Sequence, residues 1–129
     1  MKPNISASLL LARAMAQDSE GKEKETIALY RAAIRGGLKV KSLHAALIRL
    51  GAALQATGDL KGSIRVLQRA RGYFPRDVAV MLHLALAHWR VGQQELAIRQ
   101  LGDALLKASK QKSLQPYRKA LARSFHSVR

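Results

Sequence analysis

The pattern of apolar and small residues between Leu47 and Ala104 occurs twice, at a spacing of 34 residues. Large apolar residues return as large apolar residues, and small residues return as small ones. The matched pairs are Leu47 and Met81, Leu50 and Leu84, Gly51 and Ala85, Gly58 and Gly92, Ser63 and Ala97, Ile64 and Ile98, Leu67 and Leu101, and Ala70 and Ala104. A repeat of this length predicts helical hairpins that each bury an apolar side against the next hairpin.

A third copy of the pattern precedes these two, at a spacing of 37 residues. Gly21 corresponds to Gly58, and Tyr30 corresponds to Leu67. The three extra residues fall within 36–42, a connection in which an insertion has little effect on stability. The chain is therefore expected to form three hairpins.

Apolar residues recur at intervals of three and four, which predicts amphipathic helices that end at glycines. We expect six helices in the three hairpins, at about residues 7–17, 23–35, 42–57, 60–71, 78–91 and 94–107. Asn4 or Ser6, Asp59 and Asp77 are suited to cap the starts of helices. Gly51 and Ala85 are expected where two helices cross, because a larger side chain there would push the helices apart.

A seventh helix is expected from Ser113, with Pro116 in its first turn, where a missing N–H does no harm. Its apolar stripe consists of Leu114, Tyr117, Leu121 and Phe125. A terminal helix with one apolar and one charged side is what a stack of hairpins needs to cover its last face.

These elements predict an all-α chain with a single domain at residues 1–129. The expected repeats are about 7–40, 44–77 and 78–111, followed by a capping helix at about 113–127. With 3 prolines and 48% apolar residues, the composition agrees with a helical globular domain.

The amino terminus resembles a weak signal peptide, because Lys2 precedes a largely apolar stretch at 5–16. Arg13 interrupts this stretch, and Ala12 and Ala16 suit one face of a packed helix equally well, so we expect a helix that is not cleaved. No apolar run is long enough to span a membrane. The absence of cysteine excludes disulfides and thiolate metal sites and is compatible with the cytoplasmic location that we expect.

The pattern resembles the tetratricopeptide repeat over about residues 7–129. The resemblance depends on the Leu50-Gly51 pair, the turn glycines and Pro75, together with three sets of equivalent positions. Early in the second helix are the small residues Thr26, Ser63 and Ala97, then the large residues Tyr30, Leu67 and Leu101, then the alanines Ala33, Ala70 and Ala104. The chain departs from the family pattern at Gln17, His88 and Ser109, and it is also similar to a subgroup of small, largely uncharacterised bacterial members among which dimers are expected.

The resemblance implies a right-handed solenoid that acts as a non-enzymatic protein-binding scaffold or adaptor. In this family the first helix of each hairpin lines a concave groove. The corresponding positions here are Leu11, Met15, Ile48, Arg49, Ala52, Gln55, Leu82, His83, Leu86, Trp89 and Arg90. They are mostly apolar, so the family's clamp for peptide carboxylates is not implied.

An apolar groove with Trp89 flanked by Arg49 and Arg90 suits an amphipathic helix or an extended apolar segment of a partner. Two alternatives stay open. The seventh helix could cover this strip, or a second copy of the chain could occupy it in a homodimer.

Catalytic arrangements are not found. The four histidines are His44, His83, His88 and His126, and none belongs to a His-Glu-x-x-His motif. The glycines do not form a phosphate-binding loop, and the acids between Asp18 and Glu25 fit a solvated loop and a helix start. We therefore expect no enzyme activity, no metal site and no cofactor.

The net charge of +15, with a pI near 11.2, favours the encounter with an anionic partner. The basic residues that could form one surface are Arg31, Arg35, Lys39, Lys41, Lys107, Lys110, Lys112, Arg118, Lys119 and Arg123. They could equally be a solvated face that keeps the protein soluble. We favour a partner protein with an acidic, partly apolar segment over nucleic acid, because Tyr117 and Phe125, the aromatics in the basic stretches, are assigned to packing.

Overall fold

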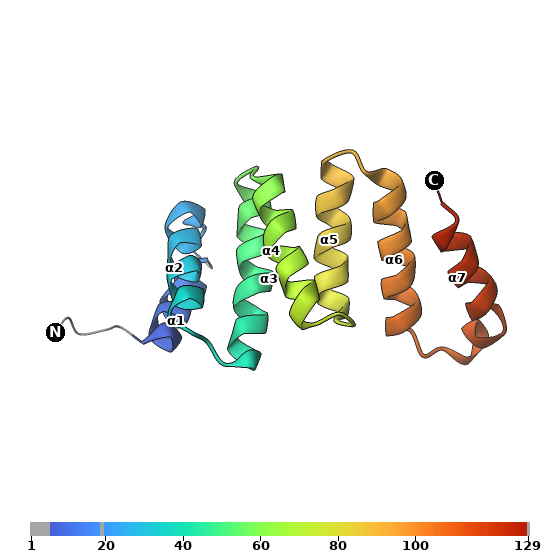
Figure 1. Ribbon diagram of the computed structural model, residues 1–129, viewed down its shortest axis with the longest axis horizontal. Coiled ribbons are helices and arrows are strands. Elements are labelled where there is room, and N and C mark those ends of the chain that lie inside the picture. The colour runs from blue at the N-terminus through green and yellow to red at the C-terminus, as the bar shows by residue number, and fades with distance from the viewer. Residues whose placement is uncertain (1–5, 19, 129) are drawn as a thin grey trace.

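The computed structural model describes residues 6–18 and 20–128, and all of its regular elements are helices. In chain order they are α1 (Ala7–Asp18), α2 (Glu23–Arg35), α3 (Val40–Ala56), α4 (Leu60–Tyr73), α5 (Val78–Arg90), α6 (Gln94–Ala108), the 3₁₀ helix η1 (Lys112–Tyr117) and α7 (Arg118–His126). The helices stand side by side along one axis in chain order, so the molecule is an elongated stack (Figure 1). This arrangement confirms the all-α solenoid of three hairpins and a terminal helix.

Most helix boundaries lie within about two residues of those expected. The terminal element differs, because a 3₁₀ helix precedes α7 where a single helix from Ser113 was expected. Pro116 lies inside this 3₁₀ helix. Proline lacks an N–H but is tolerated in a first helical turn, so it fits this short 3₁₀ turn, which leads into the regular helix at Arg118.

Helix caps and turn glycines set the hairpin geometry. The carboxylates of Asp59 and Asp77 accept hydrogen bonds from the N–H groups of Gly62 and Val80, at 2.9 and 3.0 Å. At the amino terminus the Ser6 hydroxyl accepts from the N–H of Leu9, whereas Asn4, the other predicted cap, lies outside the described residues. Gly58 and Gly92 both have φ of 88°, a conformation that favours glycine.

Small residues allow the helices of each hairpin to approach closely. A Cβ atom placed on Gly51 would lie 2.6 Å from Cγ of Leu67, which is fully buried. The Ser63 hydroxyl donates to the Gly51 carbonyl at 2.7 Å, so α3 and α4 are also joined by a buried hydrogen bond. Ala85 is likewise fully buried.

Two apolar clusters form the core, and each is built from neighbouring helices. The first joins α1, α2 and α3 around Ala14, Tyr30 and Leu50. The second joins α3, α4 and α5 around Leu67 and Leu84. Each cluster needs residues from more than one hairpin, as the repeat pattern predicts.

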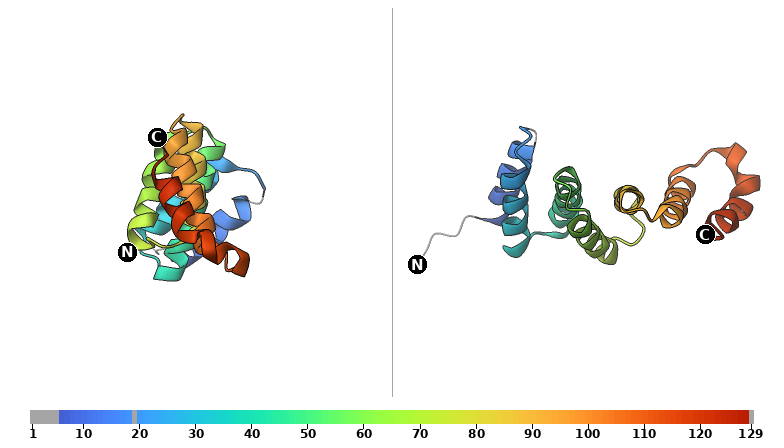
Figure 2. Two further views of the ribbon diagram at one scale, coloured as in Figure 1. Left: turned by 90° about the vertical axis from the view of Figure 1, so that its right-hand side faces the viewer. Right: turned by 90° about the horizontal axis from the view of Figure 1, so that it is seen from above.

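The carboxyl-terminal helix is more loosely seated. Figure 2 shows α7 at the end of the stack beside α6. Its anchor is Phe125, whose ring lies so close to Gly102 that a Cβ atom there would overlap the ring. No residue of η1 or α7 is buried, and Tyr117 is 62% exposed, so its assignment to the packing stripe was wrong. Within the described residues, no helix is both long and apolar enough to cross a membrane.

Candidate partner-binding surfaces

A hollow runs between α3 and α5, the first helices of the second and third hairpins. It consists of two adjoining cavities of about 420 and 210 Å³, which share Ala52 and His83. Of the predicted groove positions, its lining contains Ile48, Arg49, Ala52, Gln55, His83, Leu86 and Arg90. The small side chain of Ala52 leaves the space in the middle.

Gln55 joins the two helices at the base of this hollow. It is only 6% exposed, and its side-chain N–H donates to the His83 carbonyl at 3.2 Å. The Oε1 atom of Gln55 has no hydrogen-bond partner among the described residues. The amide nitrogen of Gln55 therefore links α3 to α5, whereas its unpaired oxygen lowers stability.

One end of the hollow is lined by two titratable side chains that were not among the predicted groove residues, Asp18 and His44. The Tyr30 hydroxyl donates to Asp18 Oδ2 at 2.9 Å. Burial and this hydrogen bond to Asp18 raise the pKa of Tyr30 to about 12, so the phenol stays neutral and acts as a donor. Asp18 occupies the same repeat position as Gln55 and Trp89, and the register could have identified it.

His44 connects the second hairpin to the start of the third. Its Nε2 lies 2.6 Å from Asp77 Oδ2, and its ring meets Phe74 edge to face at 4.8 Å. Burial raises the pKa of Asp77, but hydrogen bonds from Val80 and His44 outweigh this effect, and the pKa lies below its ordinary value of 3.8. The pair therefore fixes the wall of the hollow and holds Asp77 as a carboxylate.

The other predicted groove residues are not in this hollow. Leu11 is 7% exposed and belongs to the first core cluster, against which Met15 is also packed. Leu11 is thus a core residue, and its assignment to an open groove was wrong, because α3 contacts α1 and the first repeat is covered. Leu82 and Trp89 are exposed on α5 and do not line the hollow.

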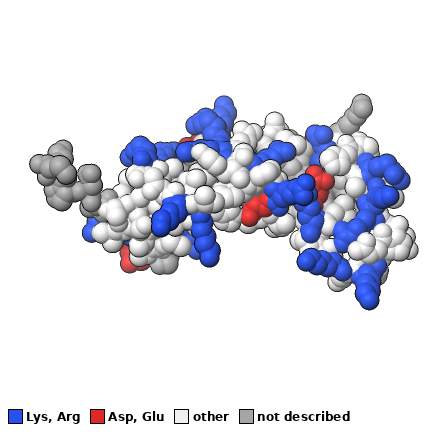
Figure 3. All heavy atoms as spheres, turned by 60° about the horizontal axis from the view of Figure 1, so that its bottom comes forward, with Lys and Arg blue, Asp and Glu red and all other residues white. Residues whose placement is uncertain are grey.

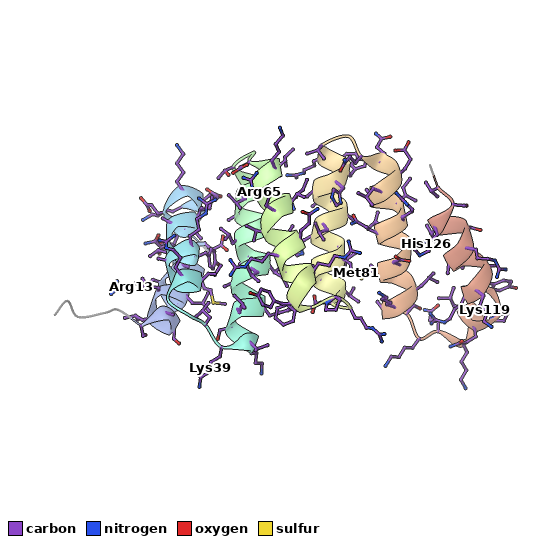
Figure 4. The ribbon with its side chains drawn as sticks, in the orientation of Figure 1. Arg13, Lys39, Arg65, Met81, Lys119 and His126 are labelled. Carbon is purple, nitrogen blue, oxygen red and sulfur yellow. The ribbon has the colours of Figure 1, made fainter. Side chains whose placement is uncertain are left out.

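The predicted basic residues lie at the surface with one exception. The exposed ones are Arg31, Arg35, Lys39, Lys41, Lys107, Lys110, Lys112, Lys119 and Arg123. Lys and Arg side chains gather over the carboxyl-terminal part of the face in Figure 3. Figure 4 labels Lys119 on α7, together with His126, whose Nε2 pairs with Asp103 of α6 at 3.1 Å.

Arg118 is the exception, because it makes contacts within the fold. Its guanidinium donates to the backbone carbonyls of Leu106 and Ser109, at the carboxyl end of α6. These carbonyls have no partner within the helix, and a cation also suits the negative end of the helix dipole. Arg118 is therefore a helix cap and was wrongly assigned to the free basic surface.

Among the described residues, neither the hollow nor the exposed basic residues bring together the pairs of side chains that catalysis usually requires. No three His, Cys, Asp or Glu side chains within residues 6–18 and 20–128 are placed to hold a metal ion. The available contacts are apolar side chains, arginines and a few hydrogen-bonding groups. Such a set is typical of a surface that recognises another molecule.

A stack of helical hairpins with a hollow of mixed apolar and polar lining and a basic exterior belongs to the class of repeat proteins that act through their surfaces. A profile of the tetratricopeptide repeat family matches residues 7–124, and the chain belongs to this family. A search of curated proteins found no match. Membership of the family indicates a scaffold for protein–protein interactions, and such repeats are typically non-catalytic.

Proposed function

We propose that this protein is a non-enzymatic adaptor that binds a segment of a partner protein in the hollow between α3 and α5. The observation that supports this proposal best is the continuity of the hollow from Arg49 through Ala52 to Arg90. Apolar atoms of Ile48 and Leu86 provide surface that a partner would remove from water. Burial of such surface is the main source of affinity in helix-in-groove recognition.

The charge of the molecule indicates the chemistry of the segment. Arg90 is exposed at one end of the hollow, where it could pair with a carboxylate. Arg49, at the other end, lies beside Tyr30 and shares the lining with the Asp18 carboxylate. With a net charge of +15, the remaining surface would speed the encounter with an acidic segment. The preferred ligand is therefore a partly apolar segment with an acidic residue at the Arg90 end.

The experiment is a pull-down with wild-type protein and with the variants Ala52→Lys and Leu86→Glu, each followed by mass spectrometry. Both substitutions place a charged side chain in the hollow, and both sites are at least partly exposed, so the fold should persist. Val40→Glu, an exposed apolar site at the start of α3 and outside the hollow, is the matched control. We expect the same partner to be lost with the first two variants and kept with the control. If both folded groove variants recover that partner as well as wild type does, the hollow is not the binding site.

Nucleic acid is a second candidate, because Tyr117 is exposed beside Lys119 and Lys112 in the sequence. An exposed aromatic ring among cations is what base stacking requires. Titration of labelled single-stranded DNA at two salt concentrations tests this possibility. Binding through phosphates should weaken by about 0.9 log units per contact for each tenfold increase in salt, and Tyr117→Ala should weaken it further. The absence of binding at low salt would eliminate this candidate.

A structural homodimer with a self-occupied groove is the remaining alternative. Light scattering across a dilution series measures the mass directly. A stable dimer that Ala52→Lys converts to a monomer would favour self-occupation over an external partner.

A further inference from the structure

The last hairpin has an apolar face that the earlier hairpins do not expose. Its members are Leu82 and Trp89 on α5 and Ile98, Leu101 and Leu105 on α6, which we call the end face. Their exposed fractions range from 41% to 62%. On α6 the spacing of three and then four residues places the side chains in one stripe along the helix.

The repeat register shows that this exposure is a property of the end of the stack. Leu101 is equivalent to Leu67 and Tyr30, which are both fully buried, whereas Leu101 is 42% exposed. On the first helices, Leu82 is equivalent to Leu11, and the exposed fractions are 41% and 7%. The same sequence positions are therefore covered in one repeat and open in another.

In the first two hairpins, these positions are covered by the first helix of the following hairpin. α3 contacts both α1 and α2, and α5 contacts both α3 and α4. α7 contacts α6 but makes no such contact with α5 within the described residues. The terminal helix lies over Gly102 and Leu106 instead, so the place that a following first helix would take is open.

We propose that the end face binds an acidic amphipathic helix of another protein, seated as the first helix of a fourth hairpin. A helix has the right shape, because α5 already covers the equivalent face of the second hairpin. The buried Val80 and Leu84 of α5 show the apolar stripe that such a helix needs. This surface is separate from the hollow between α3 and α5, and the inference goes beyond the proposed function.

The charge around the end face favours an acidic helix over a second copy docked through the same face. From Val78 onward the chain carries eight Lys and Arg, not counting Arg129, against two acids, and one of those acids, Asp103, pairs with His126. Two copies that met through their end faces would bring two strongly basic regions together, which opposes such a dimer. A helix with acidic residues on its outer side would instead be attracted to this end of the molecule.

A probe can be designed from the chain itself. The probe is a fluorescent peptide of residues 77–91 in which Leu82, Leu86 and Trp89 are each replaced by Glu. It keeps the Asp77 cap and the apolar stripe that covers the second hairpin, and it makes the outer side acidic. A matched peptide with Lys at the same three positions has the same apolar stripe and the opposite charge.

Fluorescence anisotropy with the full-length protein measures binding of each peptide. We expect the acidic peptide to bind and gain helical circular dichroism, and the basic peptide to bind at least about tenfold more weakly, a difference of about 1.4 kcal/mol. The variant Ile98→Glu/Leu105→Glu should lose the acidic peptide. Gln68→Glu/Gln111→Glu, with the same change of charge at exposed sites elsewhere, should keep it.

The outcomes separate this inference from the groove. Ala52→Lys should bind the acidic peptide as wild type does, because Ala52 lies in the hollow and not on the end face. Equal binding of both peptides, or binding that survives Ile98→Glu/Leu105→Glu, overturns the inference. So does a wild-type dimer in light scattering that this double variant converts to a monomer, since the occupant would then be a second copy.

Discussion

At the scale of single residues, small side chains at helix crossings control the spacing of the stack. Gly51→Leu should destabilise the fold by about 1–3 kcal/mol, because its side chain would overlap the buried Leu67. Urea denaturation measures this change. Gly72→Ala is the matched control, because it is a helical glycine with no atom within 4 Å of an added Cβ, and it should leave stability unchanged or slightly higher. An unchanged midpoint for Gly51→Leu would contradict the predicted crossing.

A second residue-scale effect concerns Asp77, whose pKa is lowered in the fold. A carboxyl group with a lowered pKa stabilises the folded state above its unfolded pKa, and this contribution disappears as the pH falls through the folded value. Asp77→Asn keeps a good helix cap but removes the charge that faces His44. We expect wild type to be more stable than Asp77→Asn by on the order of 1 kcal/mol at neutral pH. The gap should close below the ordinary pKa of 3.8.

Thermal denaturation of both proteins across this range checks the prediction for Asp77. A stability gap that persists unchanged at the acid end would show that the charge of Asp77 is not its source.

At the scale of elements, the end of α6 depends on a cap that comes from the next helix. Arg118→Ala would leave the carbonyls of Leu106 and Ser109 without their donor, and it should destabilise the protein by about 1 kcal/mol. Hydrogen exchange should increase first in residues 106–117. Arg123→Ala, at an exposed site on the same helix, is the control and should change neither quantity. Equal effects of the two variants would mean that Arg118 acts only as a surface charge.

At the scale of the whole molecule, the excess of positive charge opposes the compact state. With a net charge of +15, added salt should raise the melting temperature by screening the repulsion among cations. The variant Lys110→Gln/Lys112→Gln/Lys119→Gln/Arg123→Gln should show a smaller rise, because it removes four exposed cations from one end. Differential scanning calorimetry at several NaCl concentrations makes the comparison. A rise of the same size in both proteins would indicate that salt stabilises the fold by strengthening the burial of apolar surface, and not by screening charge.

Much of the fold could be predicted because its signals are local or periodic. The turn glycines, such as Gly58 and Gly92, and the capping residues Asp59 and Asp77 act on their own neighbours in the chain. The 34-residue spacing then states which helices are equivalent. The start of α7 was harder to predict, since Pro116 permits both a helical first turn and the 3₁₀ turn that precedes the helix.

The candidate site was predicted less completely, because exposure depends on neighbours and not on residue type. The register placed Leu11 and Leu82 at the same repeat position, yet one is buried and the other is exposed. In the sequence, Arg118 cannot be distinguished from the exposed cations around it, because its partners are the backbone carbonyls of Leu106 and Ser109. The predicted groove residues that line the hollow, such as Ala52, belong to α3 and α5, in the middle of the stack.

The amino-acid sequence by itself determined the class of architecture, since apolar spacing and glycine positions dictate how each hairpin forms. The tertiary structure alone decided which apolar positions are open, because a side chain on the inner side of a hairpin becomes fully buried only when the next hairpin also packs against it. Leu67 and Leu101 occupy one position of the pattern, and α5 buries the first, whereas α7 leaves the second open.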